Sequence, residues 1–156
     1  MKELFSEHHR AEPGVVPSDF AAGVESARLS LKQANSATIV VSMGVGVGTT
    51  LDVTLRQHDA AAAGNSKDLV SNVPYYYKAA ADTEFTRVDG STANLLPTAL
   101  DTAAGILVIE INSDDLDVNA DFSHISLVVA APGAARIMSV EYMVGTKKRP
   151  AYEQVL

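Results

Sequence analysis

The sequence contains no cysteine and no tryptophan, and aromatic residues make up only 6% of it. Without cysteine, the chain can form no disulfide, no thiolate nucleophile, no cysteine-ligated zinc site and no iron–sulfur cluster. Positive charge is also scarce, because 12 Lys and Arg stand against 19 Asp and Glu, for a formal net charge of −7. General nucleic-acid binders neutralise phosphates with Lys and Arg, so we expect no nucleic-acid partner.

Long hydrophobic runs are missing as well. The longest nearly apolar stretches, residues 37–48 and 126–133, fall far short of the roughly 20 residues needed to cross a bilayer. The first ten residues have neither the apolar core nor the small-residue cleavage site of a secretion signal. We therefore expect a protein that is made in the cytoplasm and has no membrane partner.

The chain does have one domain's worth of residues and many short runs of β-branched residues. It is 156 residues long and 47% hydrophobic, which is enough to bury one core. Clusters of Gly, Ala, Asn, Asp and Pro separate the runs, a pattern typical of antiparallel strands. The expected strands cover residues 28–33, 37–45, 50–57, 75–78, 84–88, 106–111, 124–130 and 136–144. The predicted fold is an all-β, antiparallel β-sandwich.

Both ends of the chain depart from this pattern. Residues 1–18 are mostly polar, with Leu4 and Phe5 as an apolar pair near the start and two prolines that would break a helix. We expect them to form an arm with at most one or two helical turns. The predicted organisation is an N-terminal arm over residues 1–18, a sandwich domain over 19–145 and a C-terminal tail over 146–156.

One glycine motif suggests a dinucleotide site but lacks the required context. Gly44, Gly46 and Gly48 form G-x-G-x-G after an apolar strand. The dinucleotide fingerprint needs a helix that opens directly after the glycines, whereas here an alternating strand follows. We therefore interpret the glycines as part of a β-hairpin.

The acidic segment after residue 113 resembles a calcium loop only in part. Asp115, Asp117, Asn119 and Asp121 occupy the first four ligand positions of an EF-hand loop. Its sixth position lacks the glycine needed for the turn, and its twelfth lacks the bidentate Glu. An EF-hand is excluded, and two interpretations stay open for the 114–121 turn: a solvated acidic turn or a weaker calcium contact.

No other pattern in the sequence indicates a catalytic site or a metal site. The histidines, His8, His9, His58 and His124, include no pair at the i, i+4 spacing of a helical zinc site. Surface or internally bonded histidines are the favoured interpretation, with a zinc site assembled only in the fold as the alternative. No G-x-S-x-G nucleophile elbow is present. We expect no metal, no cofactor and no enzymatic activity.

Two segments favour contacts with another protein. Tyr75, Tyr76 and Tyr77 are three of nine aromatic residues, and on a strand at least one ring must lie away from the core. The alternative is that all three rings serve the sandwich itself. In the tail, the basic run 147–149 and Tyr152 suit a peptide that docks on an acidic neighbour, or else they discourage strand pairing at the edge.

Several segments resemble small structural proteins of tailed bacteriophages. These segments are residues 54–57 (TLRQ), 67–69 (KDL), 75–78 (YYYK), 82–88 (DTEFTRV), 105–111 (GILVIEI) and 121–132 (DFSHISLVVAAP). Over residues 15–145, the sequence is similar to the capsid cement, or decoration, proteins of jelly-roll type. The resemblance implies a homotrimer that sits on the outer surface of an icosahedral head and binds the major capsid protein. It implies no catalytic residues.

The leading hypothesis is therefore a capsid cement protein whose terminal segments contribute contacts to the shell. We expect the arm to be disordered in the free protein and ordered on the shell. The alternatives are another virion subunit, such as a head-to-tail connector or tail component, and a carbohydrate-binding sandwich module. The residues predicted to contact the partner are Leu4, Phe5, His8, His9, Tyr75, Tyr76, Tyr77, Lys147, Lys148, Arg149 and Tyr152.

Overall fold

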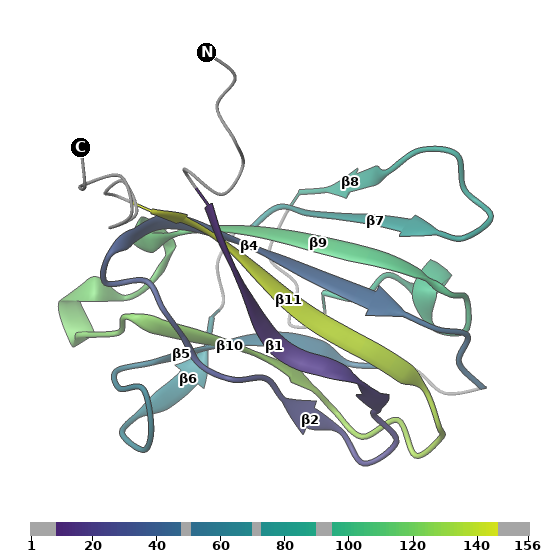
Figure 1. Cartoon of the computed structure of the whole chain (residues 1–156), viewed down its shortest axis with the longest axis horizontal. Helices are drawn as coiled ribbons and strands as arrows, with labels where there is room; N and C mark the ends of the chain where they lie inside the picture. The colour runs from purple at the N-terminus through teal and green to yellow at the C-terminus, as the bar shows by residue number, and fades with distance from the viewer. Residues whose placement is uncertain (1–8, 48–50, 70–72, 90–94, 147–156) are drawn as a thin grey trace, which may run out of the picture.

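The computed structural model describes residues 9–47, 51–69, 73–89 and 95–146, and it forms two packed antiparallel sheets (Figure 1). The larger sheet has the strand order β1-β11-β4-β9-β7-β8. The smaller sheet has the order β2-β10-β5-β6, and β3 also pairs with β10. All described strand pairs are antiparallel, as predicted for a β-sandwich.

The strands have the following bounds. The larger sheet contains β1 (His9–Asp19), β4 (Ala34–Met43), β7 (Tyr75–Ala79), β8 (Thr86–Val88), β9 (Gly105–Asn112) and β11 (Ile137–Thr146). The smaller sheet contains β2 (Val24–Glu25), β3 (Leu29–Ser30), β5 (Val53–His58), β6 (Ser66–Asp68) and β10 (His124–Val129). Three short 3₁₀ segments are present: η1 (Thr98–Leu100), η2 (Ser113–Asp115) and η3 (Val118–Ala120). In the described part of the chain, no helix is long and apolar enough to cross a bilayer.

The core lies between the sheets and follows from the period-two alternation of side chains along each strand. On β9, Leu107 and Ile109 are completely buried, while Ile106 and Glu110 point outward and are exposed. On β10 in the opposite sheet, Leu127 is completely buried in the same core cluster. The alternation that predicted the strands is thus the alternation that builds the core.

The prediction of an arm over residues 1–18 is wrong for the part that the structure describes. Residues 9–19 form the edge strand β1, which pairs along its length with β11. Prolines are tolerated on an edge strand, so Pro13 and Pro17 stop a helix without stopping a strand. Gly14 lets β1 approach closely, because a Cβ there would lie 2.9 Å from the ring of Tyr142. The sandwich domain therefore starts before residue 19.

The glycine-rich connection after β4 also differs from its prediction. It leads from β4 in the larger sheet to β5 in the smaller sheet, so it crosses between the layers and is not a hairpin. The amide N–H of Gly44 donates to the Ile137 carbonyl, and that of Gly46 donates to the Thr102 carbonyl. These bonds attach the crossing to its neighbours at one end of the sandwich.

The two ends of the sandwich are made of different segments. At one end, the chain enters at His9 and leaves after Gly145, and these two residues are register partners (Figure 1). At the opposite end lie the described residues 20–23, 44–47, 51–52, 80–85, 98–104 and 130–136, which belong to connections between strands. We call the described residues of these connections, together with the flanking Asp19 and Ile137, the loop end.

Replacing a core isoleucine should destabilise the fold much more than replacing an outward one on the same strand. We expect Ile109→Ala to lower the free energy of unfolding by about 2–5 kcal/mol, because it leaves a cavity between the sheets. Ile106→Ala removes the same atoms from a side chain that is already 38% exposed, so its cost should be below about 1.5 kcal/mol. Urea denaturation measures both, and equal losses would contradict the assignment of the two faces.

Candidate interaction surface

Most of the terminal residues predicted to contact a partner lie outside the described residues. These are Leu4, Phe5, His8, Lys147, Lys148, Arg149 and Tyr152. His9 is described, and it starts β1 opposite Gly145. The contact role of the terminal segments therefore stays a prediction.

The three tyrosines divide between the core and the outer face of β7. Tyr75 is buried in the core, and Tyr77 is half-buried and packs against the core cluster. Tyr76 lies on the outer face, with the guanidinium carbon of Arg87 5.7 Å from the centre of its ring. At least one ring lies away from the core, as expected for a strand. Tyr76 is the member of the three best placed to contact a partner.

In the acidic 114–121 turn, the carboxylates of Asp115 and Asp117 are engaged by the protein itself. Asp115 accepts a hydrogen bond from the amide N–H of Asn112 at 2.7 Å. Asp117 forms an ion pair with Lys67, and this ammonium also lies over the ring of Phe122. Among the residues that the structure describes, no group of three or more His, Cys, Asp or Glu is placed to hold a metal ion.

A polar cluster that the sequence did not reveal surrounds His58 on the outer face of the smaller sheet. His58 Nδ1 lies 2.7 Å from Ser66 Oγ, and its Nε2 lies 2.7 Å from Ser126 Oγ. Ser126 Oγ donates to a carboxylate oxygen of Glu25 at 2.8 Å. A serine beside a histidine is also the arrangement of an activated nucleophile. Here both side chains are completely buried, so a substrate cannot reach them and the cluster ties strands together.

Burial favours the neutral form of His58 and of its neighbour His124. Burial lowers the pKa of His58 below its ordinary value, and the charge of Arg28 lowers it further. Glu25 opposes this shift, while Arg56 and His124 add to it. His124 is the register partner of His58, and burial lowers its pKa too, followed by the charges of Lys32 and Arg28. Lowering the pH of the folded protein must therefore protonate two adjacent buried imidazole rings, those of His58 and His124.

A buried arginine organises the loop end. Arg136 is only 3% exposed, and its guanidinium donates to backbone carbonyls. The acceptors are Gly44 at 3.0 Å, Asp101 at 3.0 Å, Leu100 at 2.8 Å and Ala103 at 2.8 Å. Its own amide N–H donates to the carboxylate of Asp19. One side chain thus fixes the positions of the β4–β5 and η1–β9 connections relative to the start of β11.

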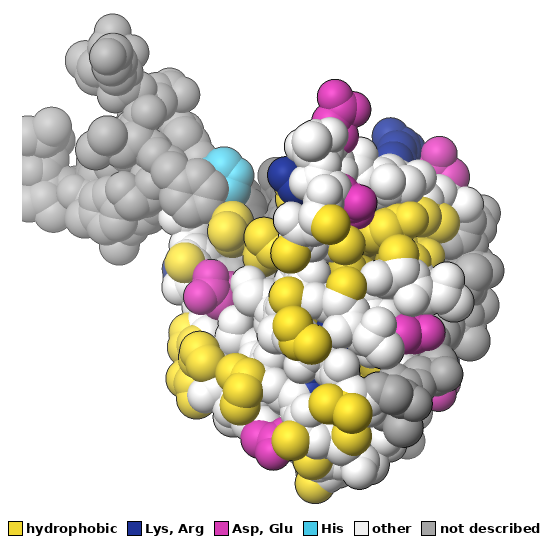
Figure 2. All heavy atoms as spheres, turned by 90° about the vertical axis from the view of Figure 1, so that its right-hand side faces the viewer, with side chains coloured by type: hydrophobic (Ala, Val, Ile, Leu, Met, Phe, Trp, Pro, Cys, Tyr) yellow, Lys and Arg dark blue, Asp and Glu magenta, His cyan; other side chains and the backbone are white. Residues whose placement is uncertain are grey.

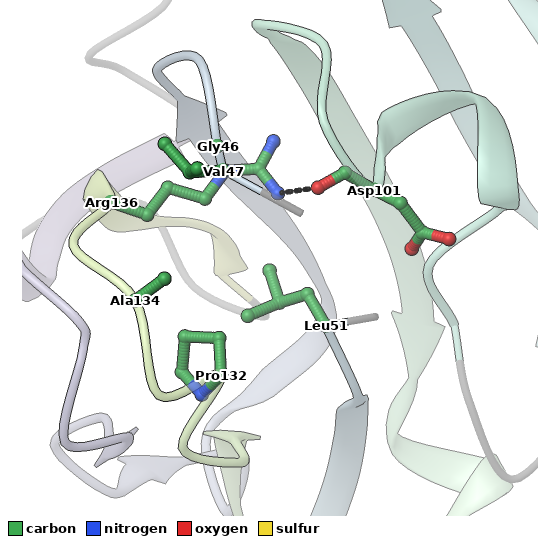
Figure 3. Close-up of a pocket in the computed structure, with 7 residues that line it drawn as sticks. All are labelled: Gly46, Val47, Leu51, Asp101, Pro132, Ala134 and Arg136. Atoms are coloured by element: carbon green, nitrogen blue, oxygen red, sulfur yellow. Dashed lines mark hydrogen bonds between the residues drawn. The ribbon is translucent and has the colours of Figure 1, made fainter. Parts of the chain in front are cut away.

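A small depression opens beside this arginine (Figure 3). Its lining residues are Gly46, Val47, Leu51, Asp101, Pro132, Ala134 and Arg136, and the space inside it that the centre of a water-sized sphere can reach is about 10 Å³. Small-molecule sites usually measure about 300–1,000 Å³. The depression is therefore far too small for a drug-sized ligand.

Three large apolar side chains of the loop end are strongly exposed, and one of them, Val47, lines this depression. Val45 is 71% exposed, Val47 is 72% exposed and Ile137 is 57% exposed. All three belong to the loop end, and Figure 2 shows hydrophobic side chains distributed over this end of the molecule. Single exposed valines are ordinary on protein surfaces, whereas a group of them marks an interaction site. The sequence did not predict this group, because its members come from two connections about 90 residues apart.

The fold defines the chain as an antiparallel β-sandwich with an apolar loop end. It aligns with the SPBc2 prophage-derived protein YomS at a TM-score of 0.45 and 9% identity, over 87% of this chain and 91% of that one. It also aligns with structures of infectious bursal disease virus, Gt and Gx strains, at TM-scores of 0.27 and 0.24 and 12% identity. Those alignments cover 95% of this chain and 44% and 42% of the other chains. No protein-family model and no curated protein matches the sequence.

The buried histidines should make the protein sensitive to mild acid. A lowered pKa means that the unfolded chain binds protons before the folded one does. The free energy of unfolding should therefore fall as the pH drops below about 6.5 and level off once the folded histidines are also protonated. Urea denaturation from about pH 5 to about pH 8 measures the slope of the free energy of unfolding against pH. His58→Gln should flatten it, and an unchanged slope in this variant would contradict the assignment.

Removing the guanidinium of Arg136 should destabilise the fold. Arg136→Met keeps much of the length but leaves the carbonyls of Gly44, Leu100, Asp101 and Ala103 without their donor, so we expect a loss of about 2–4 kcal/mol. The control is Arg10→Met, which removes an exposed arginine paired with Glu12 and should cost less than about 1 kcal/mol. Chemical denaturation compares them, and similar stabilities would show that the carbonyl contacts contribute little.

Proposed function

We propose that this protein is a structural component of a bacteriophage virion, and specifically a capsid cement protein. In this role it binds the outer surface of the major capsid protein lattice and stabilises the icosahedral head. The resemblance of several segments within residues 15–145 to phage cement proteins, an expectation drawn from the sequence, motivates the proposal. A sandwich of two packed sheets is also a rigid platform from which loops can contact a neighbour.

The observation that carries the proposal is the presence of three strongly exposed aliphatic side chains at the loop end. Val45, Val47 and Ile137 are each more than half exposed, and Arg136 holds the connections that present them. A contact surface that is already ordered loses little conformational entropy when it binds. The loop end therefore suits a lasting contact with another protein.

The strength of this contact argues for several copies acting together. Burying a valine or isoleucine completely contributes about 1.5–3 kcal/mol, and these three side chains are already partly buried. Their combined contribution of about 3–5 kcal/mol does not outweigh the loss of translational and rotational freedom of one copy. Joining copies into a homotrimer lets the contacts act together, and this trimer is part of the proposal.

Stabilisation of the head then follows from linkage. A protein that binds the assembled lattice but not its dissociated subunits shifts the equilibrium toward the lattice. No chemical step and no cofactor is required. The protein's contribution is to remain folded and to span neighbouring capsid subunits.

Co-sedimentation tests the proposal directly. The purified protein is mixed with shells of the major capsid protein of the phage that encodes it, prepared without the cement protein, and the shells are pelleted. We expect saturable binding at a fixed ratio to capsid subunits and a higher melting temperature of the shells, as linkage requires. Light scattering should give the mass of a trimer. Protein that stays in the supernatant at all concentrations, or a ring-sized assembly that binds at one vertex only, would refute the cement role.

A further inference from the structure

The charges around the loop end indicate which kind of partner surface the loop end can bind. This inference rests on the proposed function and adds which face of the protein meets the shell and what that face requires of its partner. The described residues of the loop end include five carboxylates: Asp19, Asp52, Asp82, Glu84 and Asp101. The first four are exposed and the last is half-buried.

Arg136 is the one Lys or Arg among the described residues of the loop end, and it is withdrawn from the surface. All of the contacts described for its guanidinium are to backbone carbonyls. Lys78, in the neighbouring strand β7, is half-buried, and its ammonium donates to the carbonyl of Thr83 at 3.1 Å. In Figure 3, the carbonyl of Asp101 faces Arg136 while its carboxylate is directed away. The loop end therefore presents apolar side chains with carboxylates around them.

Figure 2 shows this end of the molecule from the front. Hydrophobic side chains are scattered over the face, acidic side chains lie among and around them, and the most visible basic side chains lie near the top of the view. The small depression between Val47 and Arg136 lies within the same end.

We infer that the loop end docks end-on against an apolar patch of the major capsid protein that is bordered by Lys and Arg. An acidic border on the partner would place like charges opposite each other and cost several kcal/mol. A partner with no charges would remove water from the carboxylates without replacing it. A basic border satisfies the carboxylates and speeds the encounter, while the three aliphatic side chains fill the centre.

End-on docking also fixes where His9 and Gly145 lie. Because these two residues pair at the opposite end of the sandwich, both lie on the side that faces away from the shell. This differs from the expectation that the terminal segments contact the same subunits. The two possibilities predict different effects of substitutions at the two ends.

The test compares matched pairs of exposed residues from the two ends in the full-length protein. Val47→Asp at the loop end is matched by Val118→Asp in η3, where the side chain is 59% exposed. Glu84→Lys at the loop end is matched by Asp114→Lys in η2, another exposed acidic residue. All four side chains are exposed, so each variant should fold, and thermal unfolding verifies this. A fifth variant lacks residues 1–8 and leaves β1 intact.

Binding to the cement-free shells is measured for each variant at about 50 mM and about 300 mM salt. We expect Val47→Asp and Glu84→Lys to weaken binding by about tenfold or more at low salt, and the other three variants to stay within about twofold. Wild-type binding should weaken at the higher salt, and Glu84→Lys should show a smaller salt effect.

Three outcomes would overturn the inference. If the wild type binds shells and both loop-end variants bind equally well, the loop end is not the docking face although the cement role stands. If only the variant without residues 1–8 loses binding, the terminal end faces the shell. If the wild type itself does not bind, the proposed function fails together with the inference.

Discussion

The structure depends on the contact between two sheet faces that consist of aliphatic side chains. Every second residue of the main strands is committed to this contact, as Ile109 on β9 and Leu127 on β10 illustrate. Among the residues that the structure describes, the outward side chains and the connections are the parts left to serve a partner. In the smaller sheet, the outward face includes the buried cluster around His58. Of the described surfaces, the loop end and the outer face of the larger sheet are therefore the main candidates for an interaction.

Arg136 shows how a charged residue can organise such a surface. A guanidinium without a carboxylate partner is costly to bury, and the cost is offset here because four carbonyls receive its protons. Those carbonyls lie in connections, outside the hydrogen-bonded ladders of the paired strands. The same side chain thus completes the hydrogen bonding of the loops and keeps its positive charge away from the surface. The exposed charge of the loop end is negative as a result.

Much of the fold could be predicted from the sequence, because the alternation of apolar and polar residues along a strand indicates which side of the strand faces the core. All eight expected strands have a counterpart in the structure, including the short β8. β1 was missed because Pro13 and Pro17 mark a break in a helix, and only the tertiary fold shows that they lie on a sheet edge. The connection after β4 was read as a hairpin because alternation does not say which sheet a strand joins. The loop end could not be predicted, since the connections that carry Val47 and Ile137 come to one end of the sandwich only after folding.

The pairing of β1 with β11 has a mechanical consequence. These strands are antiparallel neighbours, and the chain enters and leaves at the same end of the pair, where His9 faces Gly145. A force that pulls the two ends apart would load the hydrogen bonds of this ladder one after another, as in opening a zipper, and never all at once. The sandwich therefore yields at low force when pulled from its termini. A load that passes through the loop end is shared by several strands, each still anchored in the core.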